Sequence, residues 1–183
     1  MIRTFRAAGF AAAMVGFVVA VATGVSAPSQ AAAPTVPVAA AAFSGTLDQQ
    51  VAAAARVETD DQEQDCLASA VYFEARGEPL NGQLAVADVV LNRVRSERYP
   101  DTICAVVEQP WQFSFVNATG RIPQADRSSE AWLRAVAIAR IAQAGTARAV
   151  ASDVLWYHAD YVSPSWGRRL ARQDKIGLHI FYS

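Results

Sequence analysis

The chain has 183 residues, with 16 basic residues against 17 acidic ones and a formal net charge of -1. This balance excludes a strongly basic protein that binds nucleic acid through its phosphates, so we expect no nucleic-acid partner. The length suits one domain of ordinary size, and a single one is expected.

Residues 1–31 have the pattern of a secretory signal, because a short basic start is followed by an apolar run over residues 7–25 and then by small residues. Cleavage is expected after Ala31, since a cut after Ala27 would leave Pro28 beside the cleaved bond. An uncleaved segment would instead anchor the protein in the inner membrane, because about 20 apolar residues span a bilayer. We expect an exported protein of the periplasm or cell envelope, without stable membrane insertion after cleavage.

The next segment, residues 32–64, is rich in Ala and Pro and shows no apolar face long enough to build a core. This composition predicts a disordered linker. Residues 65–183 contain all four Trp and all five Tyr, so the folded domain is expected there.

The first part of this domain is predicted to be helical, because apolar residues recur there at helical spacing. The expected helices cover residues 66–76, 80–96, 102–107 and 128–144. Gly77 and Pro79 end the first of them, and Gly145 closes the last.

Two cysteines, Cys66 and Cys104, belong to these helical segments. In an exported protein an even pair favours a disulfide over a metal site or a nucleophile. The bridge would close a loop of about 38 residues and stabilise the fold by about 4 kcal/mol on the chain-entropy description.

Residues 109–123 look irregular but contain Trp111, Phe113 and Phe115, so this loop is a candidate wall of a cleft. Residues 154–162 and 176–182 are rich in aromatic and β-branched residues and predict short antiparallel strands, with one or two helical turns between them. The fold class is therefore α+β and mainly helical, with a small two- or three-stranded antiparallel sheet near the C-terminus.

Glu74 is the candidate for chemistry, because Leu67, Val71 and Glu74 share one face of the first helix. An acid on an apolar stripe is costly to bury charged unless something compensates, which is typical of a reactive group. The alternative is an ordinary acid paired with a base such as Arg76, with Glu78 solvated in the turn.

Several blocks of the chain resemble the SleB-type cell wall hydrolases, the family of the spore cortex-lytic enzymes. They are residues 72–79 (YFEARGEP), 82–87 (GQLAVA), 90–94 (VLNRV), 156–159 (WYHA), 164–166 (PSW) and 176–182 (IGLHIFY). The resemblance runs from Cys66 to Tyr182, which is nearly all of the predicted domain.

The resemblance implies a lysozyme-like domain related to the lytic transglycosylases. It also implies cleavage of peptidoglycan between N-acetylmuramic acid and N-acetylglucosamine, with Glu74 at the position of the family's catalytic acid/base. We expect peptidoglycan glycan strands as the partner, a monomer, and neither a cofactor nor a metal ion.

A single acid favours lytic transglycosylation over hydrolysis. Ordinary glycosidases use two carboxyl groups across the scissile bond. One acid suffices if the muramoyl C6 hydroxyl attacks within the sugar and leaves a 1,6-anhydro end. Simple muramidase-type hydrolysis is the alternative.

Further side chains are predicted to bind the substrate or to orient Glu74. Those that would form hydrogen bonds are Glu78, Gln83, Ser114, Tyr157 and His158, and those that would offer faces to the sugar rings are Phe113, Phe115 and Trp156.

Two other functions remain open at this point. His158 and His179 on the predicted strands, together with Glu74, would suit a zinc-dependent amidase that cuts the bond between muramic acid and the peptide, although no tight ligand pair such as HExxH is present. A non-catalytic peptidoglycan-binding module would need only the aromatic faces.

Overall fold

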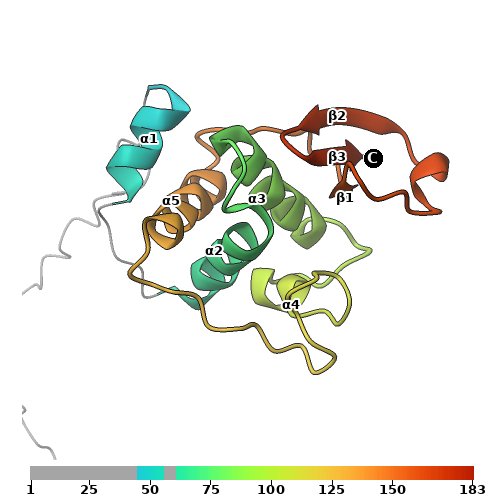
Figure 1. The fold of residues 1–183 in the computed structure, drawn as a ribbon, viewed down its shortest axis with the longest axis horizontal. Helices are drawn as coiled ribbons and strands as arrows, with labels where there is room; N and C mark the ends of the chain where they lie inside the picture. The colour runs from blue at the N-terminus through green and yellow to red at the C-terminus, as the bar shows by residue number, and fades with distance from the viewer. Residues whose placement is uncertain (1–44, 56–60) are drawn as a thin grey trace, which may run out of the picture. The chain divides into compact units, whose positions relative to one another are not determined.

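The structure is a computed structural model that describes residues 45–55 and 61–183 (Figure 1). Its elements are α1 (Leu47–Ala54), α2 (Gln62–Ala75), α3 (Leu80–Val94), α4 (Ile103–Val107), α5 (Glu130–Ala144), β1 (Trp156–Ala159), a 3-10 turn (Gly167–Arg169), β2 (Arg172–Ile176) and β3 (His179–Tyr182). This mainly helical chain with one antiparallel sheet confirms the predicted fold class.

The predicted signal lies outside the described residues. No helix within the described ranges is long and apolar enough to cross a bilayer.

Helix α2 is central to the helical part and packs against α3, α4 and α5 (Figure 1). Asp61 caps its N-terminus, because the Asp61 carboxylate accepts a hydrogen bond from the Glu63 N–H. Because neighbours enclose several of its sides, every residue from Cys66 to Tyr72 is buried. The last turn of this enclosed helix carries Glu74.

The predicted linker is wrong over the part that the structure describes, because residues 47–54 form α1. Ala54 is fully buried, and its carbonyl oxygen accepts a hydrogen bond of 2.8 Å from Arg140 Nη1 on α5. Thr146 Oγ1 also donates to Gln50 Oε1 at 2.9 Å. Sequence periodicity does not reveal these long-range contacts. Residues 32–44 and 56–60 lie outside the described part.

The sheet packs against α3 through a small apolar cluster. Ala85 and Val89 of α3 and Phe181 of β3 are all fully buried within it. Two polar residues of α3 fix the chain before β1, because Asn92 Nδ2 donates to the carbonyl oxygen of Val154 and Arg93 Nε to that of Leu155. These contacts set where β1 begins.

The strand order is β1-β3-β2, and both pairs are antiparallel. Tyr157 pairs with Phe181, so both side chains lie on the face that turns toward α3. The sequence prediction missed β2 as a separate strand, because residues 172–176 are polar and largely exposed at the sheet edge. The 3-10 turn lies inside the segment predicted to form helical turns.

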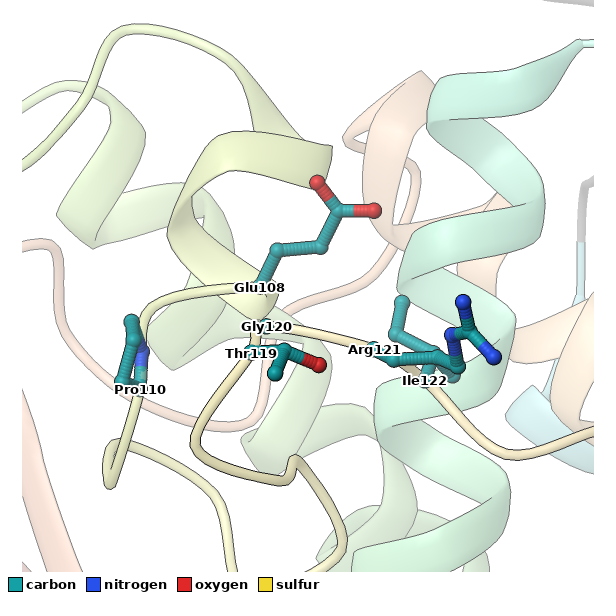
Figure 2. Close-up of a pocket in the computed structure, with 6 residues that line it drawn as sticks. All are labelled: Glu108, Pro110, Thr119, Gly120, Arg121 and Ile122. Atoms are coloured by element: carbon teal, nitrogen blue, oxygen red, sulfur yellow. The ribbon is translucent and has the colours of Figure 1, made fainter.

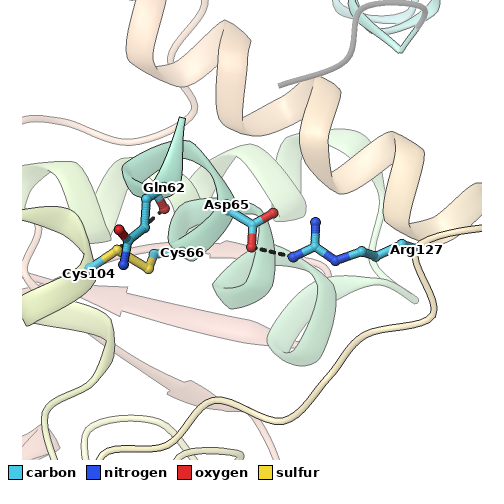
Figure 3. Close-up of polar contacts among 5 residues, drawn as sticks. All are labelled: Gln62, Asp65, Cys66, Cys104 and Arg127. Carbon is cyan, nitrogen blue, oxygen red and sulfur yellow. Dashed lines mark hydrogen bonds and ion pairs between the residues drawn. A yellow bond between two sulfur atoms is a disulfide. The ribbon is translucent and has the colours of Figure 1, made fainter. Parts of the chain in front are cut away.

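The predicted disulfide is present between Cys66 on α2 and Cys104 on α4 (Figure 3). Glu63 reinforces the same junction, because its Oε2 accepts hydrogen bonds from the N–H groups of Ile103 and Cys104. On the other side of α2, the Arg127 guanidinium pairs with the Asp65 carboxylate (Figure 3). These contacts fix α2 relative to α4 and to the loop before α5.

Candidate active site

Glu74 is partly buried at the end of α2, and each of its carboxylate oxygens accepts a hydrogen bond from a hydroxyl group. Ser114 Oγ donates to Oε1 at 3.2 Å, and the Tyr157 hydroxyl donates to Oε2 at 3.2 Å. Ser114 belongs to the loop after α4, and Tyr157 to β1. Three segments distant in sequence therefore meet at one carboxylate.

Tyr157 is held in place by aromatic neighbours on the same face of the sheet. Its ring centroid lies 5.1 Å from that of His179 and 5.7 Å from that of Phe181. Desolvation and then the charge of Glu74 raise the pKa of Tyr157 well above its usual value near 10. The phenol therefore stays protonated at neutral pH and remains a hydrogen-bond donor to Glu74.

Phe113 anchors the loop that carries Ser114. Its side chain is only 3% exposed, so the prediction that it offers a face to a sugar ring is wrong. The Arg93 guanidinium lies over the Phe113 ring, 5.6 Å from its centroid. Phe115 is less buried and stacks on Phe73 of α2 at 5.0 Å. Apolar anchoring on both sides of Ser114 keeps its hydroxyl at Glu74.

Glu78 and Gln83 fasten a turn of the backbone, and their contacts differ from the predicted substrate-binding role. Glu78 Oε2 accepts a hydrogen bond of 3.0 Å from the Leu178 N–H in the turn between β2 and β3. Gly177 has a φ of 58° in this turn, and a Cβ there would lie 1.7 Å from Glu78 Oε2. Gln83 Nε2 donates to the Glu78 carbonyl oxygen at 2.9 Å instead of contacting Glu74. Together they join the start of α3 to the sheet.

Trp156 and His158 lie on the opposite face of the sheet from Tyr157, so neither shares the face on which Tyr157 reaches Glu74. Successive side chains of a strand alternate between its faces, which separates Tyr157 from its two neighbours. The two ring nitrogens of His158 are engaged by the Ala159 carbonyl and the Tyr182 hydroxyl, both at 2.8 Å. Trp156 instead packs under the Arg98 guanidinium.

His179 lies on the same face as Tyr157, and the sequence prediction gave it no role in the glycan site. It is 7% exposed, and its Nδ1 has no hydrogen-bond partner among the described residues. Burial lowers the pKa of His179, while the charges of Glu78 and Glu74 act in the opposite direction. Antiparallel pairing of the two predicted strands could have placed His179 on the same face as Tyr157, because it pairs with Ala159, two residues farther along β1.

The geometry does not form the zinc site of the alternative amidase function. His158 pairs with Ile180 and His179 with Ala159, so the two histidines point to opposite faces of the sheet. Within residues 45–55 and 61–183, no three His, Cys, Asp or Glu side chains are grouped to hold a metal ion.

A large open pocket lies elsewhere on the loop after α4 (Figure 2). It has a volume of about 680 Å³ and is lined by Glu108, Pro110, Thr119, Gly120, Arg121 and Ile122. None of the predicted site residues lines it. The polar centre at Glu74 is therefore the better candidate for chemistry.

Comparison with protein families gives a match over most of the domain. The family model described as Cell Wall Hydrolase matches residues 77–182, so Glu74 lies just before the matched range. The spore cortex-lytic enzyme of Oceanobacillus iheyensis is 38% identical over 118 residues, 63% of this chain and 39% of that protein. The Bacillus subtilis enzyme of the same name is 36% identical over 120 residues, 63% of this chain and 35% of that protein. The chain thus spans about two fifths or less of these curated relatives.

Two solved structures are similar in both fold and sequence. The catalytic domain of the germination-specific lytic transglycosylase SleB from Bacillus anthracis has a TM-score of 0.53 and 32% identity, covering 69% of this chain and 100% of that one. The catalytic domain of the Bacillus cereus SleB protein has a TM-score of 0.54 and 34% identity, covering 70% of this chain and 96% of that one.

Proposed function

The chain belongs to the SleB-type cell wall hydrolase family, and on this premise we propose that it cleaves peptidoglycan glycan strands between N-acetylmuramic acid and N-acetylglucosamine, with Glu74 as the single catalytic acid/base. The observation that carries the proposal is the pair of hydroxyl groups, from Ser114 and Tyr157, that hold the two oxygens of Glu74. A carboxyl group fixed in this way is oriented for proton transfer.

In the first step, protonated Glu74 donates its proton to the glycosidic oxygen, and the bond from that oxygen to the muramoyl C1 breaks. The Tyr157 hydroxyl stabilises the carboxylate that forms, because burial and the charge of Glu74 keep this phenol protonated. Ser114, in the loop after α4, donates a hydrogen bond to the other oxygen. A hydrogen bond to a charged group is worth about 1.5–3 kcal/mol, so both contacts favour this state.

In the second step, the muramoyl C6 hydroxyl attacks C1 and gives its proton to Glu74. The acid is restored, no water is consumed, and the muramoyl residue ends as a 1,6-anhydro sugar. Attack within one sugar needs neither a protein nucleophile nor a second carboxylate to activate water. Glu78, the nearest acid along the chain, is engaged by the Leu178 N–H, which supports a mechanism with one acid. The similar catalytic domain from Bacillus anthracis belongs to a lytic transglycosylase, which supports the same outcome.

The glycan strand would lie along the exposed side of the Glu74–Ser114 contact. Phe115 is the partly exposed aromatic ring beside Ser114, and we assign it a sugar-contacting role. Peptidoglycan lies outside the inner membrane, so this function requires export, in agreement with the signal-like pattern of residues 1–31.

The experiment is product analysis of purified peptidoglycan digested with the protein, with and without EDTA, by mass spectrometry. We expect muropeptides one water lighter than the ordinary reducing products, in equal amounts with and without EDTA. Reducing ends would instead establish muramidase-type hydrolysis. Free stem peptides that disappear with EDTA would establish the amidase, and absence of any new product would indicate a binding module.

A further inference from the structure

Trp111 has an unusual backbone conformation for a large side chain. The Gln112 N–H donates to the Gln109 carbonyl oxygen at 3.2 Å and closes a turn with Pro110 and Trp111 at its centre. The φ of Trp111 is 69°, and no other non-glycine residue in the described ranges has a positive φ. Such a turn favours Gly or Asn at this position, because a Cβ is strained in the left-handed region.

The indole of Trp111 is also 81% exposed. Single exposed apolar side chains are common and need no explanation by themselves. This one combines exposure with backbone strain, so burial of its ring does not offset the strain. Trp132, by contrast, is 4% exposed within the core. Strain that the fold does not use for packing is typical of a binding position.

The position of Trp111 relates it to the Glu74 site. It precedes Ser114 by three residues, and consecutive Cα atoms are about 3.8 Å apart, so the two Cα atoms lie within about 11 Å. Phe113 is buried between them and fixes this part of the loop. The exposed indole therefore belongs to the same short stretch of loop as the hydroxyl that donates to Glu74.

We propose that Trp111 is a substrate-binding residue, whose indole stacks on the apolar face of a sugar ring in a subsite beside the scissile bond. The inference rests on the proposed cleavage of glycan strands. An indole is flat, rigid and amphipathic, so it offers a large contact area at a low cost in conformational entropy. The turn presents this ring before substrate arrives, which further reduces the cost of binding.

The test compares Trp111→Asn with Trp111→Tyr on peptide-free glycan strands. Asn suits the left-handed turn but removes the ring, whereas Tyr keeps an aromatic face. We expect Trp111→Asn to raise KM about fivefold to tenfold with kcat within about twofold, and Trp111→Tyr to keep most of the affinity. Leu133→Ala, which changes an exposed apolar residue on α5, is the control and should leave both constants unchanged.

A second measurement separates this inference from the proposed function. Indole fluorescence of the Glu74→Gln protein is titrated with the same strands, and we expect a saturable change that Trp111→Tyr abolishes. If the unaltered protein cleaves glycan but Trp111→Asn has an unchanged KM, or loses only kcat, the subsite is wrong and the cleavage stands. If nothing cleaves glycan, the proposed function fails, and the titration alone decides whether Trp111 binds sugar.

Discussion

The Tyr157 hydroxyl contributes to the site only through Glu74, so its removal should affect rate more than stability. We expect Tyr157→Phe to lower kcat about tenfold to a hundredfold, which corresponds to one hydrogen bond to a charged group. The ring contacts with His179 and Phe181 persist, so the midpoint of thermal unfolding should stay within a few degrees. Steady-state kinetics on glycan strands measure this. Tyr161→Phe, at an exposed position, is the matched control, and equal kcat in both variants would refute the role of Tyr157.

His179 should make stability depend on pH. Burial lowers its pKa in the folded protein, so the unfolded chain takes up a proton first as the pH falls below about 6.5. The contribution of neutral His179 to the free energy of unfolding is therefore present above that pH and is lost on acidification. The facing groups Glu78, Glu74 and Asp160 oppose this effect, and His158 adds to it.

Denaturant unfolding at about pH 7.5 and about pH 5.5 measures this contribution. We expect the free energy of unfolding to fall less in His179→Gln than in the unaltered protein, because carboxylate titrations common to both proteins cancel in the comparison. The same decrease in both proteins would show that His179 does not titrate differently on folding.

The sequence predicts which residues belong to the site better than it predicts which residues they contact. The face of α2 that Leu67, Val71 and Glu74 share follows from their spacing alone. The alternation of side chains along β1 separates Tyr157 from Trp156 and His158, and the sequence prediction did not use it. The role of Glu78 could not be predicted, because it depends on a turn about 100 residues away.

At the scale of elements, the docking of α1 is the least expected feature. Ala54 is fully buried, and Ala53, one position earlier on the same helix, is exposed. We expect Ala54→Asp to lower the free energy of unfolding by about 2–4 kcal/mol, because it places a larger, charged side chain at a fully buried position. Ala53→Asp makes the same change on the solvent side and should cost less than about 0.5 kcal/mol. Equal denaturation midpoints for the two variants would contradict the docking of α1.

The ends of elements with a regular apolar pattern were predicted to within a few residues. The helix predicted over residues 128–144 is α5, which Ser129 caps and which ends at Gly145 with a φ of 66°. Two other elements lacked this pattern. Helix α1 is short and Ala-rich, and its burial depends on contacts from α5. Strand β2 is polar because it pairs with β3 along one edge and exposes most of its side chains.

At the scale of the whole molecule, the disulfide joins the helix that carries Glu74 to the helix that precedes the Ser114 loop. Cys66 and Cys104 are 38 residues apart, and closing such a loop stabilises the folded state by about 4 kcal/mol on the chain-entropy description. We expect the double variant Cys66→Ala, Cys104→Ala to lose about this free energy in denaturant unfolding. Reductant should destabilise the unaltered protein but not the variant, and a stability unaffected by reductant would disagree with this role.

The site itself is a property of the whole molecule, since Glu74, Ser114 and Tyr157 come from α2, a loop and β1. The sequence identified all three residues, partly through their resemblance to a family. Their convergence on one carboxylate depends on how α3 fixes the sheet and how Phe113 anchors the loop. Those long-range contacts leave no periodic signal in the sequence.

The most direct test of the account is the turnover of Glu74→Gln on purified glycan strands. Gln keeps the shape of the side chain but cannot transfer the proton, so we expect the rate to fall at least about a thousandfold while the thermal unfolding midpoint stays close to that of the unaltered protein. Glu97→Gln, at an exposed turn, is the matched control and should be fully active. A folded Glu74→Gln protein with a rate within about tenfold of the unaltered one would contradict the central claim.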